Sequence, residues 1–245
     1  MRDKTLNESH VPAMFQSRKP RKNSAMENSK LATQRMAKAY ADRGDPNGWF
    51  EEFYARAGGD INKVYWADLK PNPWLLDCIK ERAAPAGTRA ITIGCGLGDD
   101  AEALALHGYR VTAFDISPSA ISMCRQRYPD SSVDYRVADL FSIPEEWRRG
   151  FALVYECNTI QILTGPSRTQ AVEAISELAA RNGEILVSCR SRNAGEQLDG
   201  FPLALDRNEI DGFQRAGLTE TRFISYDDDQ KPPVPHFFAV YQRLF

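Results

Sequence analysis

The sequence predicts an α/β fold: a mostly parallel sheet of seven strands with helices on both faces and a terminal antiparallel hairpin. Short apolar runs alternate with helical patterns from Arg89 onward, which is typical of a parallel sheet. A glycine-rich turn joins the first of these strands to a helix. The last two strands are separated only by the polar stretch 227–233, and a connection without a helix permits antiparallel pairing.

Length and composition indicate one ordinary globular domain. The chain has 245 residues, 42% of them hydrophobic, and a net charge of -2, so nothing attracts it generally to nucleic acid or to a membrane. No apolar run reaches the roughly 20 residues that span a bilayer, and no signal-peptide pattern opens the chain. Five widely spaced cysteines without a CxxC pair favour free thiols in a reducing compartment. We therefore expect a cytoplasmic protein with no metal site and no membrane partner.

The first 45 residues differ from the rest in charge. Ten basic and five acidic side chains give residues 1–45 a net charge of +5, and residues 46–245 carry -7. We expect 1–45 to be a basic tail, disordered or weakly helical, with a short helix over 31–40. The tail could touch RNA, but no aromatic residues interleave its charges as single-strand binding requires, and this argues against a nucleic-acid partner.

Residues 46–245 are expected to form a single domain that begins with a helical cover segment, 46–84. A turn signal before Trp49 starts one helix, and Asn72 is placed to cap a second over 74–82. The alternating pattern then predicts strands over 89–94, 109–115, 132–137, 151–156, 183–190, 218–226 and 235–243. It predicts helices over 98–107, 117–127, 166–181 and 206–216.

The turn after the first strand of the sheet indicates a ligand that touches backbone. Residues 90–100 read AITIGCGLGDD, and glycine both tolerates positive φ and leaves room for a close approach. A dinucleotide fingerprint needs its third glycine where this chain has Asp99, and Asp99 and Asp100 would compete with a pyrophosphate. S-adenosylmethionine fits better, because it has positive charge, a ribose and no phosphate. Asp115, which ends the next strand, is placed to bind ribose hydroxyls.

Three segments, 91–105, 111–121 and 133–140, resemble the first three motifs of class I S-adenosylmethionine-dependent methyltransferases in order and spacing. The resemblance implies the Rossmann-like fold of that family for residues 46–245. It is nearest to the thiopurine S-methyltransferase-like branch, including bacterial proteins of unassigned substrate. That branch also has a tryptophan-containing segment before the domain, similar to 65–74 here.

The resemblance implies residues for each part of the cofactor. The glycine turn would hold the methionine moiety, the second strand would end at the ribose and the third at the adenine. Tryptophan would cover the cofactor, and a glutamate after the fourth strand would face the methionine end. The residues in these places are Gly94, Cys95, Gly96, Gly98, Asp115, Ile116, Asp139, Leu140, Trp66 and Glu156. Cys95 belongs to this set by its small size, without a chemical role.

The acceptor is expected to be a small molecule held near Trp66, Asn158 and Arg190, where Arg190 could pair with an acidic group. Methyl transfer is a direct displacement, so the protein mainly aligns donor and acceptor. A general base helps a hydroxyl or amine acceptor, and Glu156 is the first candidate and Asp68 the second. The resemblance favours a sulfur or selenium nucleophile over oxygen or nitrogen. Two other functions stay open: nucleic-acid methylation with the basic tail, and cofactor binding without turnover.

Two positions depart from the family pattern. Many members have an acid where this chain has Thr92, two residues before Gly94, so the contact to the cofactor's ammonium group is expected to be weaker or to come from elsewhere. Thiopurine enzymes have an arginine where this chain has Cys157, so the thiopurine specificity is not implied.

Overall fold

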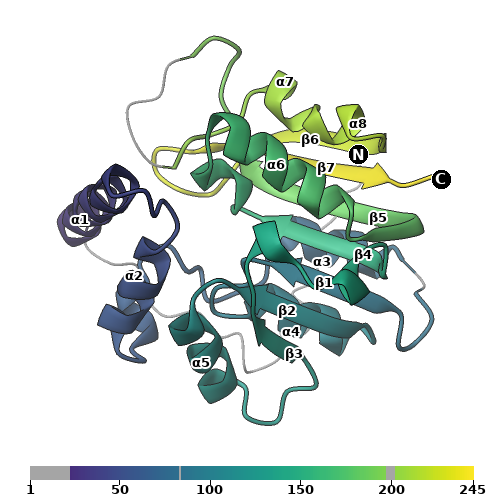
Figure 1. Ribbon diagram of the computed structural model, residues 1–245, viewed down its shortest axis with the longest axis horizontal. Coiled ribbons are helices and arrows are strands. Elements are labelled where there is room, and N and C mark those ends of the chain that lie inside the picture. The colour runs from purple at the N-terminus through teal and green to yellow at the C-terminus, as the bar shows by residue number, and fades with distance from the viewer. Residues whose placement is uncertain (1–22, 83, 197–201) are drawn as a thin grey trace, which may run out of the picture.

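A computed structural model describes residues 23–82, 84–196 and 202–245, and it confirms the predicted α/β architecture (Figure 1). Its seven strands form one sheet in the order β3-β2-β1-β4-β5-β7-β6. Only β7 runs antiparallel to its neighbours, β5 and β6. The strands are β1 (Arg89–Ile93), β2 (Arg110–Asp115), β3 (Asp134–Val137), β4 (Phe151–Cys157), β5 (Ala179–Arg190), β6 (Thr219–Asp227) and β7 (Pro235–Gln242).

Helices cover both faces of the sheet. On one face α3, α4 and α5 close a core with the sheet, and on the other α6, α7 and α8 close a second core. In Figure 1 α6 crosses in front of the strands and α3 and α4 lie behind them. The helices of the described residues are α1 (Asn23–Asp42), α2 (Trp49–Ala57), α3 (Pro73–Lys80), α4 (Asp99–Leu106), α5 (Pro118–Arg127), α6 (Gly165–Ser176), α7 (Arg207–Ile210) and α8 (Gly212–Arg215).

The cover segment is joined to the sheet through α3. The Asn72 side chain accepts from the amide of Trp74 at 2.9 Å and so caps the helix as expected, with Pro73 at its first position. Trp74 then packs against rings of the terminal hairpin, 4.9 Å from Tyr226 and 6.0 Å from Phe238 between centroids. The first turn of α3 therefore lies over the β6–β7 hairpin, beside the carboxyl end of β5.

The two N-terminal helices lie beyond α5 (Figure 1). Tyr54 and Ala57 of α2 pack with Ala120 and Met123 of α5 in a third apolar cluster. The described part of the tail is helix α1, which is longer than the expected helix over 31–40, and the rest of the predicted tail, 1–22, lies outside the described residues. Within the described ranges, no helix has both the length and the apolar character needed to cross a bilayer.

The predicted helix over 166–181 was too long. Helix α6 ends at Ser176, and Ala179 already pairs with Phe151 as the first residue of β5. The apolar pattern runs on past the helix because Leu178 and Ala179, which follow it, are also fully buried. Within β5 the backbone is irregular, because Asn182 adopts a left-handed φ of 60° and Gly183 has no room for a side chain, and the register with β4 shifts between Phe151 and Leu153.

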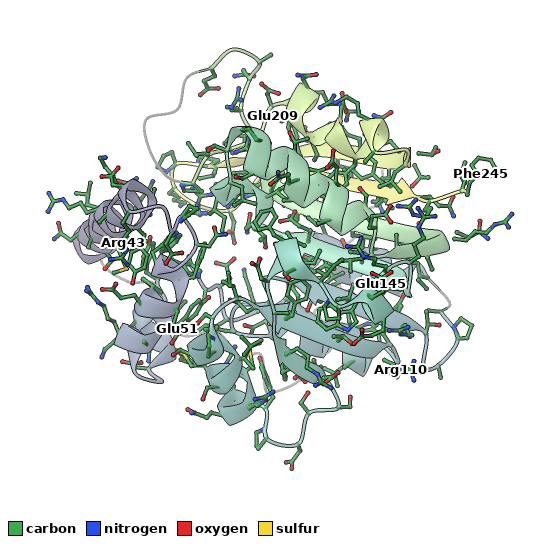
Figure 2. All side chains as sticks on the ribbon, viewed as in Figure 1. Arg43, Glu51, Arg110, Glu145, Glu209 and Phe245 are labelled. Atoms are coloured by element: carbon green, nitrogen blue, oxygen red, sulfur yellow. The ribbon has the colours of Figure 1, made fainter. Side chains whose placement is uncertain are left out.

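The predicted helix over 206–216 is two single turns, α7 and α8. Asp206 and Glu209 form a reciprocal capping box that starts α7, and the chain restarts at Gly212 as α8. Asp206 also pairs with Arg192 at 2.8 Å, and Glu209 accepts from Arg192 at 2.6 Å and from Arg168. Figure 2 labels Glu209 near α7. The prediction of one continuous helix over 206–216 is therefore wrong, because the chain forms two separate turns there.

We expect Asp206→Ala to lower the free energy of unfolding by about 1–2 kcal/mol, because it removes the cap of α7 and one partner of Arg192. Chemical denaturation monitored by circular dichroism measures this. Asp130→Ala is the matched control, since Asp130 is exposed and lies outside any helix. Equal stability of the two variants would contradict the structural role given to Asp206.

Candidate functional site

The glycine turn has the left-handed backbone that the sequence predicts. Gly94, Gly96 and Gly98 have φ values of 55°, 54° and 86°. A Cβ would lie 2.4 Å from the Thr159 hydroxyl at Gly94 and 2.5 Å from the Tyr135 hydroxyl at Gly98. Conformation and space therefore both require glycine between β1 and α4.

Asp115 ends β2 directly beneath this turn. One carboxylate oxygen accepts from the Gly96 amide at 3.0 Å and the other from the Ser117 amide at 2.9 Å. Burial raises the pKa of Asp115 to about 6, and the Glu51 carboxylate adds to the rise against the amides that lower it. The carboxyl group thus ties the turn to the adjacent strand, at the edge where α/β sheets bind ligands.

Glu51 is a site residue that the sequence did not reveal. It reaches from α2 to the start of α5, where it accepts from the Ser117 hydroxyl (2.7 Å) and from the amide (3.0 Å) and hydroxyl (2.7 Å) of Ser119. Figure 2 labels it between the two helices. An anion at a helix N-terminus is stabilised by the free amides there, so Glu51 fixes the cover segment on the domain.

Trp66 belongs to the aromatic cover over the turn. It stacks on Phe53 at 3.9 Å and donates through Nε1 to the Tyr54 hydroxyl at 3.4 Å. That hydroxyl would lie 3.2 Å from a Cβ at Gly96. Trp66 itself is 38% exposed, so it has a free surface for a ligand beside the turn.

The residues expected around the adenine lie at the ends of β2 and β3. Ile116 is half-buried after Asp115, and Leu140 is buried after β3. The half-buried Asp139 carboxylate accepts from the Phe141 amide at 2.9 Å and caps a short 3-10 turn. Because β2 and β3 are parallel neighbours, these side chains lie at one edge of the sheet.

Cys95 has the inert environment that was expected. The neighbouring Cys124 thiol and burial raise the pKa of the Cys95 thiol far above its ordinary value. Cys124 itself donates to the Gly96 carbonyl at 3.1 Å. A thiol held protonated is a poor nucleophile, so Cys95 has a packing role in the turn.

Glu156 is fully buried at the end of β4, next to β1. Its Oε1 accepts from the amides of Thr159 (2.6 Å) and Ile160 (2.9 Å), and its Oε2 has no hydrogen-bond partner among the described residues. Burial raises the pKa of Glu156 to about 7 against the two amides that lower it. Asn158 follows with a left-handed φ of 64° and an exposed side chain. Glu156 thus shapes the loop that presents Asn158.

Beyond β4, four polar side chains gather where β5 ends and β7 begins. This polar cluster consists of Asp68, Arg190, Asp228 and His236. Arg190 is the register partner of His236, which is also the register partner of Tyr226, so these three side chains share one face. His236 Nδ1 lies 2.8 Å from the Val234 carbonyl oxygen and 3.9 Å from the Asp228 carboxylate.

The charges of the polar cluster act on one another. Burial lowers the pKa of Arg190, while the carboxylates of Asp228 and Asp68 oppose this. Partial loss of hydration raises the pKa of the Asp68 carboxyl group, and the nearby carboxylates of Asp229 and Asp228 raise it further. Asp68 nevertheless remains exposed to solvent. Among the described residues the Arg190 guanidinium has no ion-pair partner within 4.0 Å, unlike Arg192, which Asp206 and Glu209 hold.

A cavity of about 330 Å³ lies elsewhere, between α6 and the pair α7–α8. Its buried arginine, Arg168, is already bound by Glu209 and by the carbonyl oxygens of Leu203 and Leu163. The cavity is lined by residues in and next to α6, α7 and α8 and by none of the glycine turn, so it is separate from the site. Within the described ranges no cluster of histidine, cysteine and acidic side chains could hold a metal ion.

Several known proteins with a similar sequence or a similar fold are methyltransferases. Residues 90–183 match the methyltransferase domain family. Two solved structures have the same fold: an N-methyltransferase NodS from Bradyrhizobium japonicum in complex with S-adenosyl-L-homocysteine (TM-score 0.59, 17% identity, 88% of this chain and 98% of that one) and an S-adenosylmethionine-dependent methyltransferase from Methanosarcina mazei (TM-score 0.61, 12% identity, 72% and 99%). Residues 90–183 thus match a methyltransferase domain, and the likeness to the two solved structures shows that the chain has their Rossmann-like fold.

Curated relatives are similar over the same region. Two ubiquinone biosynthesis O-methyltransferases, from Pseudomonas syringae pv. tomato and Xylella fastidiosa, are 31% and 32% identical over 133 and 136 residues. These alignments cover 52% and 55% of this chain. They cover 56% and 53% of the two relatives, so the chain spans about half the length of the curated relatives it matches. The resemblance to the thiopurine branch stays a prediction.

We expect Glu156→Gln to stabilise the unliganded protein at pH 8 but not at pH 5. The folded-state pKa is raised, so ionisation of Glu156 costs stability as the pH rises through about 7, and the amide avoids that cost while keeping an acceptor for the Thr159 and Ile160 amides. The gain at pH 8 should be about 2 kcal/mol by urea denaturation. A difference between variant and wild type that does not change with pH would contradict the burial argument.

Proposed function

We propose that the chain is an S-adenosylmethionine-dependent methyltransferase that methylates a hydroxyl oxygen of a small molecule. The observation that carries this is the left-handed glycine turn, braced by Asp115, at the carboxyl edge of a sheet that matches the methyltransferase domain. The O-methyltransferases among the relatives favour an oxygen acceptor. We therefore propose oxygen in place of the sulfur or selenium acceptor that the thiopurine resemblance favours. The cytoplasmic location expected from the cysteines stays a prediction.

We infer that the cofactor lies along the ends of β1, β2 and β3, which offer groups of the right chemistry. Bound there, S-adenosylmethionine supplies a methyl group on a positively charged sulfur. Asp115 would bind the ribose, while Asp139 would bind the adenine edge beside Ile116 and Leu140. The turn glycines would meet the methionine part beneath Trp66.

The polar cluster at the end of β5 is the proposed acceptor site. Its Arg190 ends β5, two strands from β1, and its His236 lies on β7, three strands from β1, which is about 14 Å at the usual strand spacing. Arg190, free of an ion pair among the described residues, would bind an acidic group of the acceptor. Trp66 and Asn158 would contact the acceptor from the cover segment and from the loop after β4.

His236 is better placed than Glu156 or Asp68 to be the general base. A carbonyl oxygen can only accept, so the contact at 2.8 Å to Val234 requires the proton on Nδ1 and leaves the Nε2 lone pair free. Asp228, 3.9 Å from Nδ1, would stabilise the imidazolium that forms when Nε2 takes a proton. Glu156, by contrast, uses Oε1 to hold the loop after β4.

The test is transfer of a labelled methyl group from S-adenosylmethionine to a panel of catechols and hydroxybenzoates, with thiols, amines and RNA in parallel. We expect label on a hydroxyl, preferentially in acceptors with a carboxylate. Label on thiols or on RNA alone would replace the proposal with one of the other acceptor classes. Tight cofactor binding with no transfer to any acceptor would favour a binding module without turnover.

We expect kcat/KM for the hydroxyl acceptor to rise with pH through a value below 6.5, because burial lowers the pKa of His236. Replacement of His236 by Gln should lower kcat by about 10²–10⁴-fold and remove that limb of the profile. Glu156→Gln is the comparison: if Glu156 were the base, its variant would lose a limb near pH 7 and the His236 variant would keep it.

A further inference from the structure

We propose that Asp100 binds the ammonium group of the cofactor and so supplies the carboxylate that position 92 lacks. The proposal rests on the proposed function, because it takes S-adenosylmethionine as the ligand. It concerns the methionine end of the site, where Thr92 departs from the family pattern. Four observations support it, and they come from α4, β1, β4 and the loop before α3.

The two acids that begin α4 have different surroundings. Asp99 is compensated, since Arg127 donates to both of its carboxylate oxygens at 2.9 Å. Asp100 accepts from the Asn72 amide at 2.7 Å, and among the described residues no Lys, Arg or His side chain lies within 4.0 Å of it. Of this pair, therefore, only Asp100 has its charge left for a ligand.

Two buried hydroxyl groups that lack a full hydrogen bond lie on the same side of the sheet. Thr92 on β1 and Tyr155 on β4 are register partners, and each is 2% exposed. Thr92 Oγ1 has no hydrogen-bond partner among the described residues. The Tyr155 hydroxyl has none of full hydrogen-bond geometry, although the Asp100 carboxylate and the Cys157 thiol lie close enough to interact with it. Asp100 interacts electrostatically with Tyr155, so the carboxylate and the hydroxyl are neighbours. Unpaired buried polar groups are costly, and a polar ligand group between them would relieve that cost.

Asp100 also faces the correct edge of the sheet. It follows the last turn glycine by two residues, so it stands at the end of the turn where the methionine part is expected. The same Asn72 that donates to Asp100 extends its side-chain amide to Ser188 at 3.1 Å and to Cys157 at 3.8 Å, at the ends of β5 and β4. Asp100 therefore lies between the glycine turn and the proposed acceptor site.

The electrostatics favour a cation over an anion or a neutral group. The charged side chains around Asp100 are Asp99 and Asp68, both acidic, and burial is the main cause that raises the pKa of Asp100 to about 7. A primary ammonium offers three donors, enough for the carboxylate and for the hydroxyl oxygens of Thr92 and Tyr155. A resident metal ion fits less well, because no cluster of three ligating side chains exists in the described parts of the chain.

The test compares two ligands by calorimetric titration of the full chain at pH 8. S-adenosylhomocysteine carries the ammonium group, and S-(5′-deoxyadenosyl)-4-thiobutanoate has the same skeleton without it. We expect Asp100→Asn to weaken binding of S-adenosylhomocysteine by about 10- to 100-fold, as for loss of a charged hydrogen bond, and binding of the analogue by about twofold at most. Asn keeps an oxygen to accept from the Asn72 amide, so the fold should be retained.

Asp99→Asn is the matched control, because it changes the adjacent carboxylate that Arg127 already holds. It should affect both ligands equally. An equal loss for both ligands in Asp100→Asn, or no loss for either, would overturn the ammonium assignment. Failure of the wild-type chain to bind either ligand would instead overturn the proposed function, so the two failures are distinguishable.

Discussion

The hydrogen bond from the Gly96 amide to the Asp115 carboxylate is the contact on which the site depends. It closes three left-handed glycines into one turn between β1 and α4, and the other oxygen of Asp115 holds the start of α5 through Ser117. The turn also determines where α4 begins, and hence where Asp99 and Asp100 stand. This brace therefore connects the turn before α4 to the start of α5.

The site is built from acids that the fold does not neutralise. Asp100, Asp115 and Glu156 have raised pKa values, with burial as the main cause in each. Buried carboxylates without cations reduce stability, and such groups concentrate where a protein binds a charged ligand. In contrast, Arg127 is paired with Asp99 and Arg192 with Glu209, so these charges are compensated within the protein. A cationic cofactor and an acceptor with an acidic group complement this arrangement.

Much of the fold and of the cofactor side could be predicted because the signals are local. Three alternating glycines, an acid at the end of the next strand and Asn72 before a proline each require only a few neighbouring residues. Where the sequence failed, the cause was non-local. The expected helix over 166–181 is too long because Leu178 and Ala179 continue the apolar pattern of the helix, and only the pairing of Ala179 with Phe151 shows that a strand has begun.

The acceptor side shows the same limit. His236 meets Asp228 and Arg190 only through the register of β5, β7 and β6, which no local pattern reveals. Glu51 acts on α5, 66 residues away in the chain, and Glu156 had the right place but its hydrogen bonds to the following loop could not be read from sequence. In the sequence, Asp100 indicates only a carboxylate that would compete with a phosphate. Its lack of a cation became evident from the packing of Asn72 and Arg127.

The most direct test of the central claim is calorimetric titration of S-adenosylhomocysteine into the wild-type chain and two glycine variants. Gly96→Ala places a methyl group 3.2 Å from the Tyr54 hydroxyl in the turn, whereas Gly108→Ala introduces the same left-handed strain where nothing lies within 4 Å. We expect saturable one-to-one binding that Gly96→Ala weakens by at least about tenfold and Gly108→Ala leaves nearly unchanged. Absence of binding in the wild type, or equal affinities in all three proteins, would contradict the assignment of this turn as the cofactor site.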